Sequence, residues 1–275
     1  MTGFTPHQIM GIIGYPVEHS LSPLLHTTAF NLLGIPAALS PWSVPPDELP
    51  VFVSAMRLLN LHGVCVTIPH QRTIIPFLDE VTEWVAMMGA ANTIFWRDGR
   101  LCGDNTDVPG FIDPLSDDLP ALDSRVLIIG AGGAARAVAG GCKTMGLGEI
   151  TVTSRQQEPA ETLAEHFGLK VVDWADRGRV AADIIVNTTP VGLRGRFEND
   201  TPYEAAWFRS QGGLAYDLVY VPTETRFLKE AAEAGWRTVS GLEMFFGQAA
   251  RQFKIWTGRD FPRQAREVVF EALRV

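Results

Sequence analysis

The sequence predicts an α/β fold with two mostly parallel sheets. Short apolar runs alternate along the chain with helix-length amphipathic segments, a pattern typical of strands that are connected by helices. The chain has 275 residues, of which 46% are hydrophobic and 20% charged, so it can bury two moderate cores. A stretch rich in proline, aspartate and serine at 109–124 precedes a new strand, and we expect a domain boundary near it.

The first strand is predicted over residues 8–13, a continuous apolar run. A helix is expected to follow, with Ser22 as its N-cap, Pro23 at its first position and Gly34 just beyond its end. Ser20 and Ser22 then lie at a strand-to-helix junction, and in an extended segment both hydroxyls point to one side. Such junctions are where open α/β sheets bind ligands.

A second β-branched run, residues 64–68, predicts another strand that Pro69 ends. Thr67 and Gln71 are therefore expected near the end of this strand. The strand predictions at 92–97 and 101–105 flank the dipeptide Asp98-Gly99, which indicates a hairpin.

The second sheet begins after the proline-rich stretch. Its strands are predicted at 126–129, 149–153, 184–187, 214–218 and 237–240. Two helices are expected to end the chain, at about 242–256 and 262–273.

A glycine-rich loop, Gly130-Ala-Gly-Gly-Ala-Ala135, joins the first of these strands to a helix-like segment. In that setting the glycines permit a tight turn and let backbone N–H groups approach a pyrophosphate. The alternative is a glycine-rich turn that serves packing alone. We interpret the loop as a dinucleotide site formed by Gly130, Ala131, Gly132, Gly133 and Ala134.

The next strand ends in Ser154-Arg155, where NAD-binding proteins carry an acid for the ribose 2′-hydroxyl. An arginine instead fits a 2′-phosphate, both by charge and by bidentate geometry. An ordinary surface arginine is the alternative. The residue pair Ser154 and Arg155 therefore predicts NADP as the cofactor.

Composition argues against several other classes of partner. The net charge is −8 and the basic residues are scattered, so no positive stripe is offered to nucleic acid or to an anionic membrane. We find no export signal or membrane-spanning stretch, which predicts a cytoplasmic protein. No metal site is expected, because neither the cysteines Cys65, Cys102 and Cys142 nor the histidines other than His70 show metal-ligand spacing. These histidines are interpreted as surface or helix residues: His7, His19, His26, His62 and His166.

Five segments together resemble the shikimate dehydrogenase family, in that family's order along nearly the whole chain. They are Gly14-Tyr-Pro-Val-Glu-His-Ser-Leu-Ser-Pro23, Gly63-Val-Cys-Val-Thr-Ile-Pro-His70, Gly89-Ala-Ala-Asn-Thr93, Asn105-Thr-Asp107 and 241–258. The resemblance implies an N-terminal α/β substrate domain, residues 1–110 with 241–275, and a Rossmann-type doubly wound domain, residues 111–240. It also implies NADP-dependent interconversion of 3-dehydroshikimate and shikimate, in aromatic amino acid biosynthesis.

The resemblance assigns roles to single residues. Ser20 and Ser22 match the pair that binds the substrate carboxylate, and Thr67, Asn92 and Asp107 match the ligands of the ring hydroxyls. Further substrate and cofactor positions are Tyr216, Gln248, Thr188 and Gly241. Helix capping is an alternative or additional role for Ser22 and a strong competing role for Asp107, and ordinary packing or surface positions are the alternatives for Tyr216 and Gln248.

Gln71 stands where the family has a lysine that is paired with the aspartate matched by Asp107. A glutamine amide can donate a hydrogen bond, but it cannot give or take a proton near neutral pH. Loss of a general acid typically costs a factor of about 10² to 10⁴ in rate. In an extended segment His70 and Arg72 point away from Gln71, so either could replace the lysine only after a backbone change.

Several interpretations remain open from the sequence. The chain is a slow enzyme, an engineered lysine-to-glutamine variant or a natural homologue with altered chemistry. A non-catalytic protein that senses shikimate-pathway metabolites or dinucleotide is the rival from another class. A dehydrogenase of a related ring acid, quinate or an amino analogue, is less favoured because both serines are intact.

Overall fold

The computed structural model describes residues 7–116 and 120–273, which form two units. Unit 1 consists of residues 1–106 and 248–275, and unit 2 of residues 107–247. Among the described residues each unit holds one six-stranded sheet. The predicted α/β fold with two sheets is confirmed.

The sheet of unit 1 is mixed, with the strand order β2-β1-β3-β5-β6-β4. β1 is parallel to both β2 and β3, whereas β5 runs antiparallel to β3 and to β6. The carboxyl ends of β1 and β3 therefore lie at the same edge as the beginning of β5. The strands are β1 (Gln8–Gly14), β2 (Ala37–Ser43), β3 (Gly63–Val66), β4 (Glu80–Val81), β5 (Thr93–Arg97) and β6 (Arg100–Asp104).

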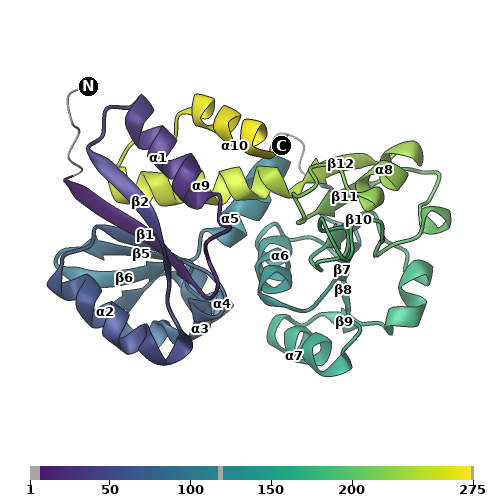
Figure 1. Ribbon diagram of the computed structural model, residues 1–275. Coiled ribbons are helices and arrows are strands. Elements are labelled where there is room, and N and C mark those ends of the chain that lie inside the picture. Colours follow the sequence, from purple (N-terminus) through teal and green to yellow (C-terminus); the bar gives the residue numbers. More distant parts are fainter. Residues whose placement is uncertain (1–6, 117–119, 274–275) are drawn as a thin grey trace. The chain divides into compact units, whose positions relative to one another are not determined.

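Helices cover both faces of this sheet (Figure 1). α2 (Leu49–Leu58) packs on one face, where Val64 and Ile94 are fully buried. α1 (Ser22–Leu32) and α9 (Gly241–Thr257) cover the other face, where the rings of Phe30 and Phe253 stack at 5.3 Å. Because side chains alternate along a strand, residues next to Val64 and Ile94 face α1 and α9. The remaining helices of the unit are α3 (His70–Thr73), α4 (Glu83–Met88) and α10 (Glu267–Leu273).

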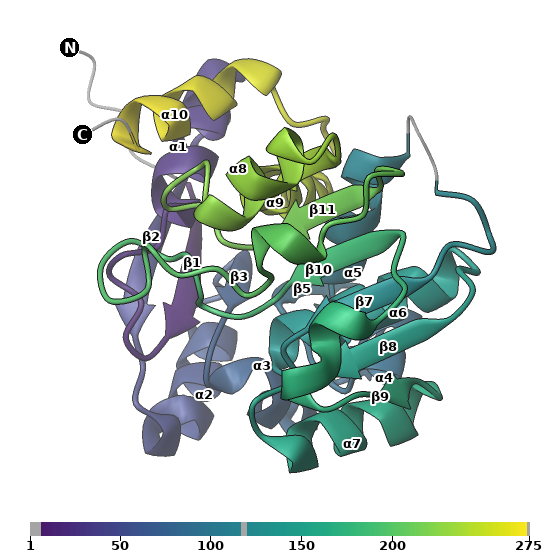
Figure 2. The same cartoon turned by 90° about the vertical axis from the view of Figure 1, so that its right-hand side faces the viewer.

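The sheet of unit 2 has the order β12-β11-β10-β7-β8-β9, and all neighbouring strands are parallel. Figure 2 shows β11, β10, β7, β8 and β9 side by side in that order. The order reverses at β7, and in open α/β sheets ligands bind beyond the carboxyl ends of the strands at such a switch point. The strands are β7 (Val126–Ile129), β8 (Ile150–Thr153), β9 (Lys170–Val171), β10 (Ile184–Asn187), β11 (Leu214–Asp217) and β12 (Arg237–Ser240).

Two cores sandwich the sheet of unit 2, as a doubly wound fold requires. One core packs α5 (Asp107–Ile112), α6 (Gly133–Thr144) and α7 (Gln157–Phe167) on one face. The other packs α8 (Arg226–Glu233) on the opposite face, with Phe227 fully buried.

The boundaries of the units differ from the predicted 110/111 and 240/241. The ring of Phe111 in α5 stacks on Tyr216 at 5.1 Å, and it leaves room only for a glycine at position 141, where a Cβ would come within 2.6 Å of the ring. A Cβ at Gly247 in α9 would lie 3.0 Å from the carbonyl oxygen of Gly110. Close packing therefore draws α5 and the first turns of α9 into unit 2.

Local signals predicted the turns well. The hairpin is confirmed, with Asp98 and Gly99 at φ +51° and +74° between β5 and β6, and Gly34 follows α1 at φ +63°. The strand predicted over 64–68 is shorter, because β3 ends at Val66. Gln71, which we expected in an extended segment, lies in the helical turn α3, so that expectation is wrong.

Candidate functional site

Three segments of unit 1 meet at the edge of its sheet. The N–H of Tyr15 donates to the carbonyl oxygen of Ile68 at 3.0 Å, and the N–H of Thr67 donates to that of Ile13 at 2.9 Å. The N–H of Val66 donates to the carbonyl oxygen of Asn92 at 2.8 Å. The loop after β1, the loop after β3 and the start of β5 are thereby held together. Predicted substrate residues lie in or next to all three segments: Ser20, Ser22, Thr67 and Asn92.

The serine pair has a different local geometry from the predicted one. α1 begins at Ser22, and no side chain caps it; instead the hydroxyl oxygen of Ser20 accepts the N–H of Ser22 at 3.2 Å. Leu21 has φ −85° and ψ −6°, which is helical backbone, so the extended segment and the Ser22 cap are both corrected. Because a hydroxyl both accepts and donates, Ser20 keeps its O–H for a ligand.

Gln71 lies across the end of β3. Its side-chain amide donates to the carbonyl oxygen of Val66 at 3.3 Å. The backbone carbonyl oxygen of Gln71 accepts the N–H of Ala91 at 2.7 Å. The side chain is partly exposed. The position predicted for the proton-transfer residue is therefore tied to two of the three segments at the edge.

The surroundings of His70 do not favour it as a replacement for the missing lysine. The imidazole of His70 is fully buried, and its Nε2 lies 2.7 Å from the carbonyl oxygen of Val44. Because a carbonyl oxygen only accepts, Nε2 carries the hydrogen and donates it there. Arg72 is exposed on the same helical turn. His70, Gln71 and Arg72 are neighbours in one helical turn, not in an extended segment, and their side chains point in different directions around it.

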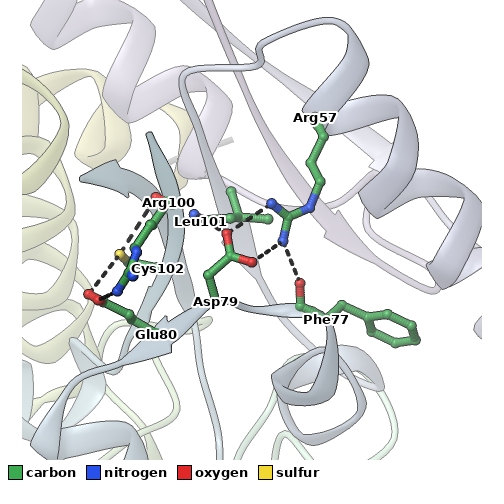
Figure 3. Close-up of polar contacts among 7 residues, drawn as sticks. All are labelled: Arg57, Phe77, Asp79, Glu80, Arg100, Leu101 and Cys102. Carbon is green, nitrogen blue, oxygen red and sulfur yellow. Dashed lines mark hydrogen bonds and ion pairs between the residues drawn. The ribbon is translucent and has the colours of Figure 1, made fainter. Parts of the chain in front are cut away.

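The segment that follows α3 is anchored on its far side. Figure 3 shows the guanidinium of Arg57 facing the carboxylate of Asp79, which it contacts with two hydrogen bonds of 2.9 Å. Arg57 also donates to the carbonyl oxygen of Phe77 at 2.9 Å, and Asp79 accepts the N–H of Leu101 at 2.7 Å. The exposed ion pair adds little stability. Its bidentate geometry ties the segment at Phe77 and Asp79 to Arg57 of α2.

Asn92 is buried at the start of β5, with 3% of its surface exposed. Its Oδ1 accepts the hydroxyl of Thr93 at 2.7 Å and the N–H of Thr106 at 2.8 Å. Its Nδ2 donates to the hydroxyl oxygen of Thr106 at 3.0 Å. One N–H of the Asn92 amide is thus committed to the protein, and its role toward substrate stays a prediction.

The motif Asn105-Thr-Asp107 divides between the units. Asn105 is buried, and its Nδ2 donates to the carbonyl oxygen of Ala90 at 2.9 Å. Asp107 is the first residue of α5 and is partly exposed. Asn105 and Thr106 are therefore buried within the framework, whereas Asp107 is partly exposed and its catalytic role stays a prediction.

Two tyrosines of the segment 216–220 occupy different environments. Tyr216 is fully buried in the core of unit 2, and burial raises the pKa of its hydroxyl. Tyr220 lies beyond the end of β11, is partly exposed and stacks on Phe245 at 5.6 Å. The core position of Tyr216 does not favour the predicted contact with substrate. Gln248, in α9 of unit 1, is partly exposed.

The glycine-rich loop has the predicted strand-loop-helix setting, between β7 and α6. The N–H of Gly130 donates to the carbonyl oxygen of Thr153 at 2.8 Å. Gly130 has φ +113°, and a Cβ there would lie 2.3 Å from the hydroxyl oxygen of Thr188, so only glycine fits. Gly132, Gly133 and Ala134 are exposed, and Ala131 is partly exposed.

The loops on either side complete this edge of unit 2. Thr188 donates its hydroxyl to the carbonyl oxygen of Ile129 at 2.9 Å, beside the glycine loop. Arg155 is exposed directly after β8, and the hydroxyl oxygen of Ser154 accepts the N–H of Gln156 at 3.3 Å. A Cβ at Gly241 would lie 2.4 Å from the carbonyl oxygen of Leu218. The exposed cation and the unhindered N–H groups at the start of α6 fit a phosphorylated dinucleotide.

A buried carboxylate at the same edge escaped the sequence analysis. Asp217 is fully buried, and its oxygens accept from Asn187 Nδ2 at 2.8 Å, the Thr225 hydroxyl at 2.6 Å and the N–H of Val219 at 3.0 Å. Burial outweighs these donors and raises the pKa of Asp217 to about 7. The available signal was a polar residue at or next to the end of two apolar strand runs: Asn187 in 184–187 and Asp217 in 214–218.

Among the described residues, no helix has the length and apolarity needed to cross a membrane. The described parts of the chain also hold no group of three or more His, Cys, Asp or Glu side chains arranged to bind a metal ion.

Comparisons with known proteins agree with this geometry. The family model of the shikimate dehydrogenase substrate-binding domain matches residues 12–94, and that of the shikimate 5′-dehydrogenase C-terminal domain matches 241–267. A model of NADP oxidoreductases that depend on coenzyme F420 matches 125–192.

Whole-chain relatives carry the same description. The chain is 53% identical over 266 residues to a shikimate dehydrogenase (NADP(+)) of Pelobacter propionicus, and the match covers 96% of each chain. It is 48% identical over 270 residues to a shikimate dehydrogenase (NADP(+)) of Oleidesulfovibrio alaskensis, and the match covers 98% of this chain and 96% of that one. It superposes with a TM-score of 0.85 and 37% identity on shikimate 5-dehydrogenase of Thermus thermophilus in complex with NADP(H) and shikimate, covering 97% and 98% of the two chains. The chain belongs to the shikimate dehydrogenase family.

Proposed function

We propose that the protein catalyses the NADP-dependent reduction of 3-dehydroshikimate to shikimate, a step of aromatic amino acid biosynthesis. The observation that carries the proposal is the edge of unit 1, where loops bearing Ser20, Thr67 and Asn92 are hydrogen-bonded together. The relatives above are described as enzymes with this activity. We place the reaction in the cytoplasm, the reducing compartment that the cysteine usage predicts.

The residues of unit 2 fit NADP. The exposed backbone of Gly132 and Gly133 offers N–H groups to the pyrophosphate, and the positive end of α6 favours that charge. Arg155 is the group for the 2′-phosphate. When bound, the reduced cofactor supplies the hydride. Ala131, Ala134, Ser154, Thr188 and Gly241 shape the same site.

The residues of unit 1 hold the substrate. Ser20 and Ser22 bind the carboxylate with neutral donors, and Thr67, Asn92 and Gln248 bind ring hydroxyls. Of the two tyrosines in the segment 216–220, the partly exposed Tyr220 is better placed for a ligand than the buried Tyr216.

The site lacks the lysine that would transfer a proton to or from the substrate. Asp107 can hold or accept a proton, whereas the amide of Gln71 can only polarise the substrate through a hydrogen bond. We therefore expect the substrate to bind but its turnover to be slow or undetectable.

A turnover assay with shikimate and NADP, run beside calorimetric binding of both ligands, tests this proposal. Binding of both with slow formation of NADPH supports a dehydrogenase of low activity. Binding of both without turnover at high protein concentration supports the rival, a non-catalytic sensor. If quinate binds more tightly than shikimate, the related ring acid is the substrate.

Arg155 leads to a prediction on cofactor choice. The unmodified protein should bind NADP more tightly than NAD by about 1 to 3 kcal/mol, the range for hydrogen bonds to a charged group. Arg155→Ala should remove most of that preference and leave NAD affinity unchanged. Calorimetry with both cofactors checks it, with Arg179→Ala as the control, since Arg179 is an exposed arginine elsewhere in unit 2 that pairs with Asp176. Equal affinities for NAD and NADP in the unmodified protein would contradict the prediction.

A further inference from the structure

A buried hydrogen-bond network in unit 1 is centred on Gln252, of which 2% is exposed. Its Nε2 donates to the carbonyl oxygen of Asn92 at 3.4 Å and to the hydroxyl oxygen of Thr93 at 3.1 Å. Its Oε1 lies 3.3 Å from the thiol of Cys65 and 3.3 Å from Nε2 of His26. One amide thereby connects α9 to α1, β3 and β5.

The direction of each hydrogen bond in the network is fixed by chemistry. The carbonyl oxygen of Asn92 can only accept, so the nitrogen of the Gln252 amide faces it and the oxygen faces Cys65 and His26. Nε2 of His26 must then donate, which requires either the neutral tautomer with its hydrogen on Nε2 or the charged ring. Burial lowers the pKa of His26 to about 4, so the ring is neutral at pH 7 and brings no charge into the network.

The members of the network stand beside the predicted substrate residues. Gln252 is one helical turn after Gln248 in α9, and His26 is one turn after Ser22 in α1. Residues four apart lie on one face of a helix, one above the other. Cys65 and Thr93 lie two residues before Thr67 and one residue after Asn92, respectively. The network therefore forms the layer behind the substrate residues.

Thr93 connects Gln252 to the side chain of Asn92 through two hydrogen bonds. The Thr93 hydroxyl oxygen accepts from Gln252, and its O–H donates to Oδ1 of Asn92 at 2.7 Å. That oxygen also accepts the N–H of Thr106 at 2.8 Å. With Oδ1 occupied from inside the protein, Nδ2 is the part of the Asn92 amide that retains a hydrogen for a ligand.

We propose that Gln252 is a positioning residue of the substrate site, which acts through Thr93 to hold the Asn92 amide so that it offers an N–H, not a carbonyl oxygen, to a ring hydroxyl. This inference rests on the proposed function, because it assigns Asn92 to a hydroxyl of shikimate. It predicts that the bound hydroxyl accepts from Asn92 and donates its own hydrogen elsewhere.

The test compares Thr93→Val with Thr93→Ser, using Gln252→Leu as a third variant. Valine keeps the shape of threonine without the hydroxyl, whereas serine keeps the hydroxyl. Binding of shikimate, and of analogues that each lack one ring hydroxyl, is measured by calorimetry. The preference of the unmodified protein for shikimate over one analogue should fall by about 5- to 10-fold in Thr93→Val and Gln252→Leu, the worth of one hydrogen bond. Thr93→Ser should keep the preference.

Controls separate positioning from general damage. Val53→Ala removes packing from the core next to α2, so it should lower stability and leave the preference among analogues unchanged. NADP affinity should stay within about twofold in every variant, since the hydrogen bonds in question all lie within unit 1. If Gln252→Leu does not fold, the pair Thr93→Val and Thr93→Ser still tests the hydroxyl through which Gln252 is proposed to act.

The outcomes distinguish this inference from the proposed function. An unmodified protein that binds no shikimate overturns both. A protein that binds shikimate, but whose preference among analogues is the same in Thr93→Val as in Thr93→Ser, overturns only the positioning role of Gln252. A loss of affinity that is equal for shikimate and every analogue has the same consequence, because it marks a purely structural role.

Discussion

Gln71→Lys is expected to raise the rate of shikimate oxidation by about 10² to 10⁴, with most of the gain in kcat. The lysine restores a group that can exchange a proton. The backbone hydrogen bonds that build the edge of unit 1, including the one from the N–H of Ala91 to the backbone carbonyl oxygen of residue 71, remain. Substrate affinity should change little, because glutamine and lysine both donate hydrogen bonds. Initial rates with shikimate and NADP, at saturating and limiting shikimate, check it.

Two further variants define the origin of the gain. Gln71→Met keeps the length of the side chain without a donor, and it should not exceed the rate of the unmodified protein. Adding Asp107→Asn to Gln71→Lys should remove much of the gain, since paired catalytic residues act as a unit. If the unmodified protein already matches Gln71→Lys, another group, such as Asp107 through a water molecule, transfers the proton.

Asp217 should make unit 2 less stable as the pH rises from about 4 to about 7. Its pKa is raised in the folded state, so between the unfolded value of 3.8 and the folded value of about 7 the folded protein binds more protons than the unfolded chain. The stabilisation from the protonated form is complete below the unfolded pKa and is lost as the pH passes the folded pKa. Asp217→Asn cannot titrate and lacks this dependence.

The measurement is the free energy of unfolding of both proteins in urea. The stability of the unmodified protein minus that of Asp217→Asn should be larger at about pH 5 than at about pH 8 by about 2 to 3 kcal/mol. Asp183→Asn is the control: the guanidinium of Arg125 holds the pKa of Asp183 below its ordinary value, so that carboxylate stays ionised over this range. A difference for Asp217→Asn that does not change with pH would show that its carboxylate is ionised throughout.

Local patterns in the sequence were sufficient for most of the fold. The strands at 184–187 and 237–240 have the predicted bounds, and Asp98-Gly99 marked the hairpin, because turn chemistry and apolar runs act over a few residues. The helical turn at Gln71 was missed, since it is held by the N–H of Ala91, a residue twenty positions away. The domain boundaries were displaced because they depend on packing around Gly141 and Gly247.

The candidate site shows the same limit. Motifs led to Ser20, Thr67, Asn92 and the glycine loop, whose segments the structure brings to sheet edges. The sequence could not distinguish the buried Tyr216 from the partly exposed Tyr220, since both lie in one short segment. Gln252 was missed because its partners come from three other elements, and a glutamine in a helix is usually exposed.

The division of α9 between the two units has a consequence for the order of folding during synthesis. Unit 2 is a continuous stretch, whereas unit 1 requires residues 248–275, which are made after all of unit 2. Phe253 is fully buried against Phe30, and Nε1 of Trp256 donates to the carbonyl oxygen of Ile94 at 3.0 Å. Since these contacts complete the core of unit 1, we expect unit 2 to become resistant to protease first on ribosomes stalled at increasing chain lengths. The unit that is encoded first would then be the last to fold, and its unpaired apolar surface would depend on chaperones while the nucleotide domain is already formed.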